Sequence, residues 1–152
     1  MQESKCRTYL AILVATTTLF WFGTVKAQAP YSGESNMSGR WQGTRTTTGG
    51  IGVDEYRVHS IRFDLKQRGE DLSGSYKCYA GKKANADCNN PVGTITAGKI
   101  KQGNIDLKVQ AQPNDLSCSF AGSVAGNRMN GSYTCYVGGT LASNGVWQAR
   151  RR

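Results

Sequence analysis

Apolar and polar residues alternate with a period of two along much of this chain, most clearly in residues 61–78 and 118–135. Such alternation is typical of a β-strand with one face in the core and the other in water. The two segments match position by position, and both close with Gly-Ser-Tyr-x-Cys. Each is divided by a glycine-led pair, Gly69-Glu70 or Gly126-Asn127, that suits a tight turn with a positive φ. We therefore predict one β-hairpin that is used twice.

The two-residue turns determine which residues of the paired strands lie opposite each other. In the second hairpin Cys118 lies opposite Cys135, at a spacing that a cross-strand disulfide bridges. In the first hairpin Ile61 takes the place of Cys118, so Cys78 has no cysteine opposite it. We predict two disulfides, Cys118–Cys135 and Cys78–Cys88.

Turn-prone residues divide the rest of the chain into short segments, and no apolar stretch at helical spacing exceeds two turns. Among these turn signals is Ser143-Asn144-Gly145, just before the last predicted strand. Eight short antiparallel strands close most naturally into an up-and-down β-barrel, which leaves no unpaired edge. We predict this barrel, with a two-sheet β-sandwich as the alternative. The predicted strands are residues 39–47, 56–67, 71–78, 92–99, 104–111, 116–124, 128–137 and 145–151.

The N-terminal residues have the layout of a secretory signal peptide: Lys5 and Arg7, an uncharged and largely apolar run, then small residues. The run is shorter than the roughly 20 residues that span a bilayer. Because Pro30 would make cleavage after Ala29 unfavourable, we place the cut after Ala27. We expect a signal peptide over residues 1–27, a flexible segment over 28–38 and the barrel over 39–152, in a protein that is secreted or periplasmic.

Cleavage there removes one of the five cysteines and leaves 16 basic against 9 acidic residues, a net charge near +7. An even number of cysteines in a small exported domain indicates disulfides. With one histidine and no Cys-x-x-Cys, we expect no metal site and no cofactor. The alternation turns His59 inward, where a packing role is the usual one, and no nucleophile motif accompanies it. We therefore expect no catalytic residues.

The first predicted strand begins Gly39-Arg40-Trp41, and the last contains Trp147 and leads into three arginines. In this the chain resembles the calycin superfamily of lipocalins, fatty-acid-binding proteins, avidins and small bacterial metalloprotease inhibitors. The resemblance implies that Trp41 lies at the closed base of the barrel and that Arg150 or a neighbour covers it. A guanidinium stacks well on an indole, which supports this assignment physically. No ligand carries over from the resemblance.

The predicted register brings two facing aromatic pairs into the barrel. They pack as a core, or they line a cavity in which the tyrosine hydroxyls orient a ligand. The candidate ligand-binding residues are Phe63, Tyr76, Phe120, Tyr133 and Met129.

These observations favour an exported, non-catalytic protein that holds a small apolar or aromatic ligand in its barrel. The alternative is an inhibitor or interaction module that acts on a secreted enzyme, with residues 28–38 as the inserting element. A third hypothesis is a protein held on an anionic cell envelope by its basic exterior. We expect no nucleic acid partner, since the chain shows no strip of alternating aromatic and basic residues.

Overall fold

The computed structural model describes residues 36–50, 57–80, 87–89, 91–112 and 115–152. Contacts within the chain separate Met1–Pro30 from Tyr31–Arg152, and every described residue belongs to the second unit. No helix among the described residues is long and apolar enough to cross a membrane. The expected signal peptide and its cleavage site lie outside the described residues and stay predictions. The strands are β1 (Gly39–Gly49), β2 (Arg57–Arg68), β3 (Asp71–Tyr79), β4 (Val92–Lys101), β5 (Asn104–Gln112), β6 (Leu116–Ala125), β7 (Arg128–Val137) and β8 (Thr140–Arg151).

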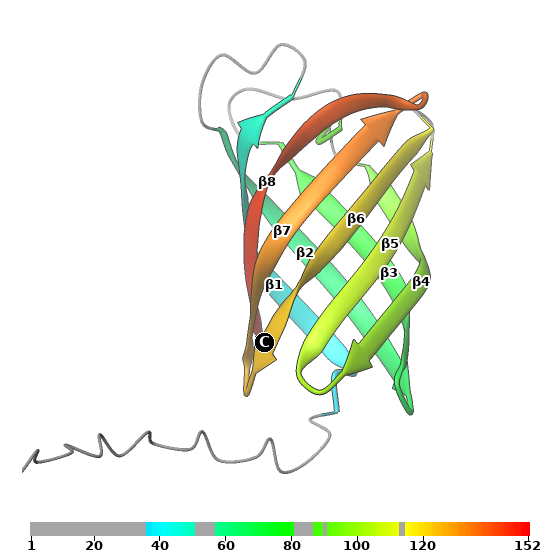
Figure 1. The fold of residues 1–152 in the computed structure, drawn as a ribbon, viewed down its shortest axis with the longest axis vertical. Helices are drawn as coiled ribbons and strands as arrows, with labels where there is room; N and C mark the ends of the chain where they lie inside the picture. Colours follow the sequence, from blue (N-terminus) through cyan, green and yellow to red (C-terminus); the bar gives the residue numbers. More distant parts are fainter. Residues whose placement is uncertain (1–35, 51–56, 81–86, 90, 113–114) are drawn as a thin grey trace, which may run out of the picture. The chain divides into compact units, whose positions relative to one another are not determined.

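The eight strands form a closed antiparallel barrel, which confirms the predicted fold class (Figure 1). Each strand pairs with the next along the chain, and β8 pairs with β1 to close the sheet. The tight turns β2–β3, β4–β5 and β6–β7 lie at the end drawn below, together with the start of β1 and the end of β8. The β7–β8 turn lies at the upper end.

The predicted register of both hairpins is confirmed. Phe63 lies opposite Tyr76 across β2 and β3, and Phe120 opposite Tyr133 across β6 and β7. The turn glycines Gly69 and Gly126 have positive φ angles of 58° and 56°. Both predicted disulfides, Cys78–Cys88 and Cys118–Cys135, are present.

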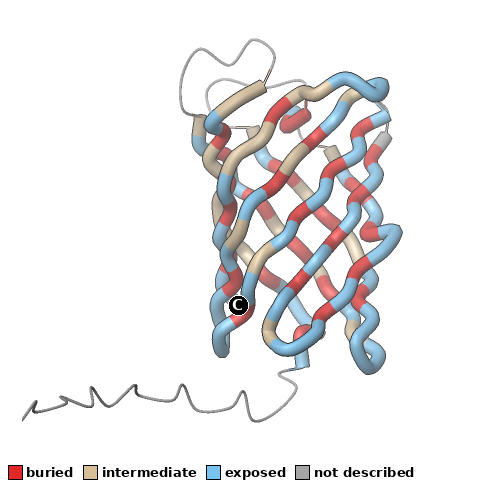
Figure 2. The backbone as a smooth tube through the Cα atoms, in the orientation of Figure 1, coloured by how far each residue is buried: buried red, intermediate tan, exposed pale blue. Residues whose placement is uncertain are grey.

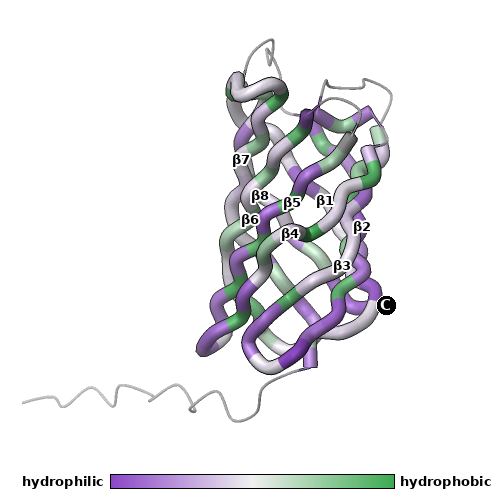
Figure 3. Tube along the Cα trace, turned by 90° about the vertical axis from the view of Figure 1, so that its right-hand side faces the viewer, coloured by the Kyte–Doolittle hydropathy of each residue, from purple (hydrophilic) through white to green (hydrophobic). Residues whose placement is uncertain are grey.

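Buried and exposed residues alternate along the strands, as the red and blue segments of Figure 2 show. Figure 3 shows hydrophobic and hydrophilic residues alternating along the strands, and most of the buried residues are apolar. Complete burial of one large apolar side chain contributes about 1.5 to 3 kcal/mol. The barrel interior therefore supplies the main stabilisation, and it includes Trp41, Phe63, Phe120, Ile105, Leu107 and Met129.

Several inward positions are glycine because neighbouring strands approach too closely there for a side chain. A Cβ on Gly131 would lie 1.9 Å from the carbonyl oxygen of Ala121, and one on Gly43 would lie 1.8 Å from that of Gln148. Glycine kinks of this kind let strands bend enough to close a small barrel.

Trp41 is buried at the lower end, and of Arg150 and its neighbours it is Arg151 that lies over the indole. The Arg151 guanidinium carbon lies 5.3 Å from the centre of the Trp41 ring. Arg150 is exposed on the outer face. The alternation explains why it is Arg151: Trp147 and Ala149 point inward, so Arg151 shares their side of β8.

Residues 36–38, the described part of the segment expected to be flexible, lie against this lower end. Met37 is fully buried, and its carbonyl accepts a hydrogen bond from Trp41 Nε1 at 2.9 Å. Ser38 Oγ accepts one from the backbone N–H of Gln67 at 3.0 Å. The core therefore extends beyond the start of β1.

The last strand begins earlier than predicted. The turn before β8 is Gly138-Gly139, with φ angles of 56° and 79°, while Ser143, Asn144 and Gly145 belong to the strand. A bulge interrupts the β7–β8 register between Cys135 and Tyr136. Since a bulge breaks the period of two, the start of β8 does not follow the alternation.

Candidate ligand site at the upper end of the barrel

The four aromatic residues predicted to face each other meet in one cluster in the barrel interior. The Phe63 and Phe120 ring centres are 5.2 Å apart in an edge-on arrangement, and Tyr76 lies 5.2 Å from Phe120. Tyr133 stacks on Phe120 at 5.8 Å. Trp147, which was not predicted to take part, contacts both Phe63 and Phe120. Edge-on and offset aromatic pairs each add about 0.5 to 1.5 kcal/mol beyond burial.

Phe63, Tyr76, Phe120 and Tyr133 are buried, and all of the other three contact Phe120, so in this structure they act as core. Met129 lies apart from them, near the lower end of β7, opposite Val124 and Ala149. The predicted ligand-binding role of the five residues stays a prediction.

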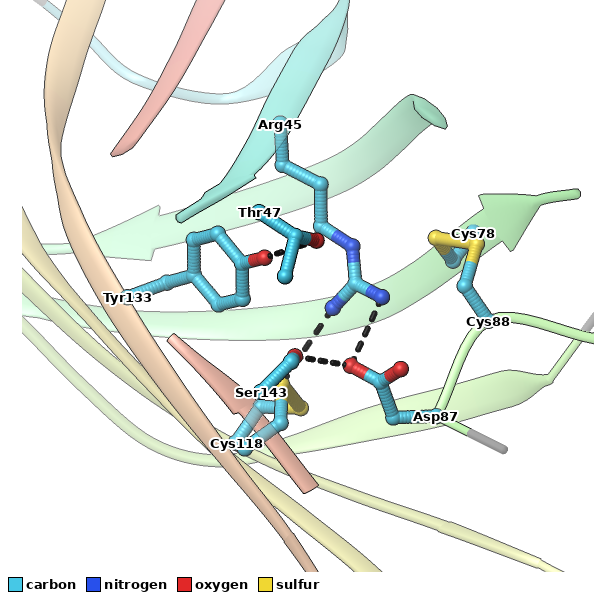
Figure 4. A network of polar contacts seen from close by, with 9 residues as sticks. Arg45, Thr47, Cys78, Asp87, Cys88, Cys118, Tyr133 and Ser143 are labelled. Atoms are coloured by element: carbon cyan, nitrogen blue, oxygen red, sulfur yellow. Dashed lines mark hydrogen bonds and ion pairs between the residues drawn. A yellow bond between two sulfur atoms is a disulfide. The ribbon is translucent and has the colours of Figure 1, made fainter. Parts of the chain in front are cut away.

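Above the rings the interior becomes polar, and its centre is a buried ion pair (Figure 4). Arg45, on β1, is fully buried, and its Nη2 lies 2.7 Å from Oδ2 of Asp87. Asp87 is 1% exposed and belongs to the connection between β3 and β4. The barrel wall thus supplies the cation, and a connection supplies the anion.

Further groups complete the surroundings of this pair. The Ser143 hydroxyl donates a hydrogen bond to the same Asp87 oxygen. Arg45 Nη1 donates to Cys135 Sγ at 3.3 Å, and its guanidinium lies 4.8 Å from the centre of the Tyr133 ring. The Tyr133 and Thr47 hydroxyls, 2.7 Å apart, share a hydrogen bond.

The electrostatics follow from burial and from these neighbours. Burial alone would lower the pKa of Arg45, but Tyr76, Asp87 and Tyr133 raise it above its ordinary value, so the side chain keeps its charge. Burial raises the pKa of the Tyr76 hydroxyl, which therefore stays protonated. Burial, with the nearby positive charge of Arg45, lowers the pKa of His59, so the imidazole is neutral at pH 7.

Among the described residues, the buried polar atoms of this region without a hydrogen-bond partner include Arg45 Nε, both ring nitrogens of His59 and the Tyr76 hydroxyl. His59 is 2% exposed, as the inward orientation predicted for it requires, and it lies next to Arg45 in the β1–β2 register. Buried polar groups are normally hydrogen-bonded. The surroundings of Arg45 therefore have more hydrogen-bonding capacity than the described residues use.

A covalent tether holds the anion in place. Asp87 precedes Cys88, which is bonded to Cys78 on β3. Both cysteines are fully buried. The disulfide thus carries a residue from a connection into the barrel interior.

The alternation could have indicated Arg45, since it shares the inward face of β1 with Trp41, Gly43 and Thr47. No sequence pattern indicated Asp87 or Ser143, because one lies outside the strands and the other follows the bulge. Among the described residues no group of three or more His, Cys, Asp and Glu could hold a metal ion.

Comparison of the chain with protein families, with curated proteins and with solved structures found no match. The resemblance to calycins therefore stays a prediction, and so does the inhibitor hypothesis, whose inserting segment lies mostly outside the described residues.

Proposed function

We propose that this protein is an exported, non-catalytic binding protein that takes up a small ligand with an acidic group and an apolar body at the upper end of its barrel. The observation that carries the proposal is the fully buried Arg45 guanidinium, whose counter-charge comes from a connection. In this proposal the carboxylate of Asp87 occupies the position of the ligand's acidic group.

The groups around Arg45 support an acidic and partly apolar ligand. A carboxylate at the place of Asp87 would accept hydrogen bonds from Arg45 and Ser143, the same donors that Asp87 uses. The unpartnered nitrogens of His59 can serve a second polar atom of the ligand. Beside them, the Tyr133 ring and the Cys118–Cys135 disulfide form an apolar wall.

Replacement of Asp87 by asparagine tests the proposal. The variant loses the competing carboxylate and leaves the Arg45 charge uncompensated, so it should bind small aromatic and aliphatic carboxylates more tightly than the natural protein. We expect a gain of about tenfold, which corresponds to 1.4 kcal/mol. Isothermal titration with a panel of such acids measures it, and the matching primary alcohols are the control ligands.

The same variant in thermal unfolding provides an independent readout. A bound acid should raise the midpoint of the Asp87→Asn protein more than that of the natural protein, because only a ligand of the folded state stabilises it. Equal and weak binding of acids and alcohols by both proteins would contradict the proposal. Native mass spectra of protein from its own host, before and after organic extraction, would identify a resident ligand.

A further inference from the structure

A shallow groove runs along the outer face of β8, between the side chains of β1 and β7. It consists of two hollows of about 370 and 350 Å³ that share Thr44, Asn130 and Gln148. Glycines form part of its floor, at the places where the strands approach most closely. The groove is on the outside of the barrel, and of the five residues predicted to bind an interior ligand only Met129 is among those that line it.

The lower hollow is bordered by two arginines that lie directly opposite each other, Arg128 on β7 and Arg150 on β8. Like charges in this arrangement destabilise a sheet. Neither arginine has an ion pair with a described residue, and no carboxylate lines either hollow. By contrast, Arg40 and Lys99 each pair with a carboxylate, Asp64 and Asp71 respectively.

The remaining groove side chains are neutral hydrogen-bonding groups. Amides and hydroxyls line both hollows, and they come from Gln42, Thr44, Thr46, Asn130 and Gln148. Among the residues that line the two hollows, Val146 is the one large apolar side chain that is exposed, at 54%. Such a lining suits sugar hydroxyls and offers little surface for insertion into lipid.

We infer that this groove binds an anionic polysaccharide, whose sulfate or carboxylate groups contact Arg128 and Arg150 while its sugar hydroxyls contact the amides along β7 and β8. Guanidinium groups bind such oxyanions through paired hydrogen bonds. The unfavourable arginine pair becomes favourable once an anion lies between the two side chains. This site is independent of the interior site proposed above.

Titration of the full chain with dextran sulfate, a polyuronate and uncharged dextran tests the inference. We expect binding of one or both charged polymers, which identifies the acidic group, and none of dextran. Replacement of Arg128 and Arg150 by glutamine should weaken binding about tenfold. The matched control replaces Lys101 and Lys108 by glutamine, which removes the same charge from β4 and β5 on the opposite wall, and should change affinity less than about threefold.

A second pair of variants separates sugar recognition from attraction of charge alone. Replacement of Asn130 and Gln148 by alanine keeps the net charge and should weaken polysaccharide binding. Arg150→Gln removes one charge of the unfavourable arginine pair, so it should leave the unfolding midpoint of the free protein unchanged or raise it. Equal weakening by the arginine and lysine variants would overturn the inference. So would an unchanged affinity in the Asn130 and Gln148 variant, or equally tight binding of a single-stranded DNA of the same charge.

Discussion

Arg45 and Asp87 form an ion pair, 2.7 Å apart, at the buried upper end of the barrel, although one lies on β1 and the other on the connection after β3. An ion pair removed from water is favourable only while both charges are present. Stability at this end of the barrel therefore depends on a segment that is not part of the sheet.

Removal of one charge of this pair should be more harmful than removal of both. We expect Asp87→Asn to lower the free energy of unfolding by about 3 to 5 kcal/mol, since it leaves a buried charge unpaired. The double replacement of Arg45 by methionine and Asp87 by leucine should cost clearly less. Urea unfolding of the ligand-free proteins measures both free energies. Equal losses in the single and the double variant would contradict the expected coupling between the two charges.

Part of the stabilisation by the Cys78–Cys88 disulfide should come from its holding Asp87 beside Arg45. Replacement of both cysteines by serine should lower the free energy of unfolding by about 2 to 3 kcal/mol through loop entropy alone. The total loss should be larger, because Asp87 is then no longer held beside Arg45. In an Asp87→Asn background the same replacement should cost less. A double-mutant cycle from chemical denaturation measures the difference, and strict additivity would contradict the coupling.

His59 should make stability fall as the solution becomes mildly acidic. Its pKa is lowered in the folded state by burial and by Arg45, whereas in the unfolded chain it is near 6.5. The unfolded state therefore binds the proton more readily, so the contribution is complete above about pH 6.5 and is lost as the pH falls toward the folded-state pKa. Denaturation midpoints at pH 7.5 and 5.5 measure it. Because His59 is the only histidine in the sequence, His59→Gln should make the denaturation midpoint depend less on pH between 7.5 and 5.5.

Neighbouring arginines at the end of β8 should differ sharply in their effect on stability. Arg151 Nη2 donates a hydrogen bond to the carbonyl of Ser38 at 2.6 Å and lies over Trp41. We expect Arg151→Gln to lower the free energy of unfolding by about 1 to 2 kcal/mol. Arg150→Gln, at an exposed site, is the control and should not lower the free energy of unfolding. The reverse order in thermal melts would contradict the assignment of Arg151 to the barrel base.

The parts of the fold that follow from local chemistry could be predicted. Glycine-led turns at Gly69 and Gly126 determine the hairpin registers, and the second register places Cys118 opposite Cys135. Since each side chain on a strand faces away from its neighbours, a correct turn also determines what lies inside. The four buried rings follow from the same argument.

The candidate site could not be predicted in the same way, because its residues meet through contacts between distant segments. Ser143 is polar at an inward position because it donates to Asp87, but its sequence context is typical of a turn. Asp87 owes its burial to the disulfide at Cys88. Arg45 lies at an inward position of β1, where the alternation leads one to expect an apolar residue, so a charged side chain there is not recognised as part of a site.

The pairing of β1 with β8 has a consequence for how the barrel forms. Every other pair joins strands that follow each other along the chain, whereas this seam joins the first strand to the last. Until β8 is in place, β1 presents a free edge that can pair with another chain as readily as with its own. The order of synthesis leaves this edge open longest. Protection against aggregation is therefore a property of the completed ring, and a chain interrupted before β8 loses it altogether.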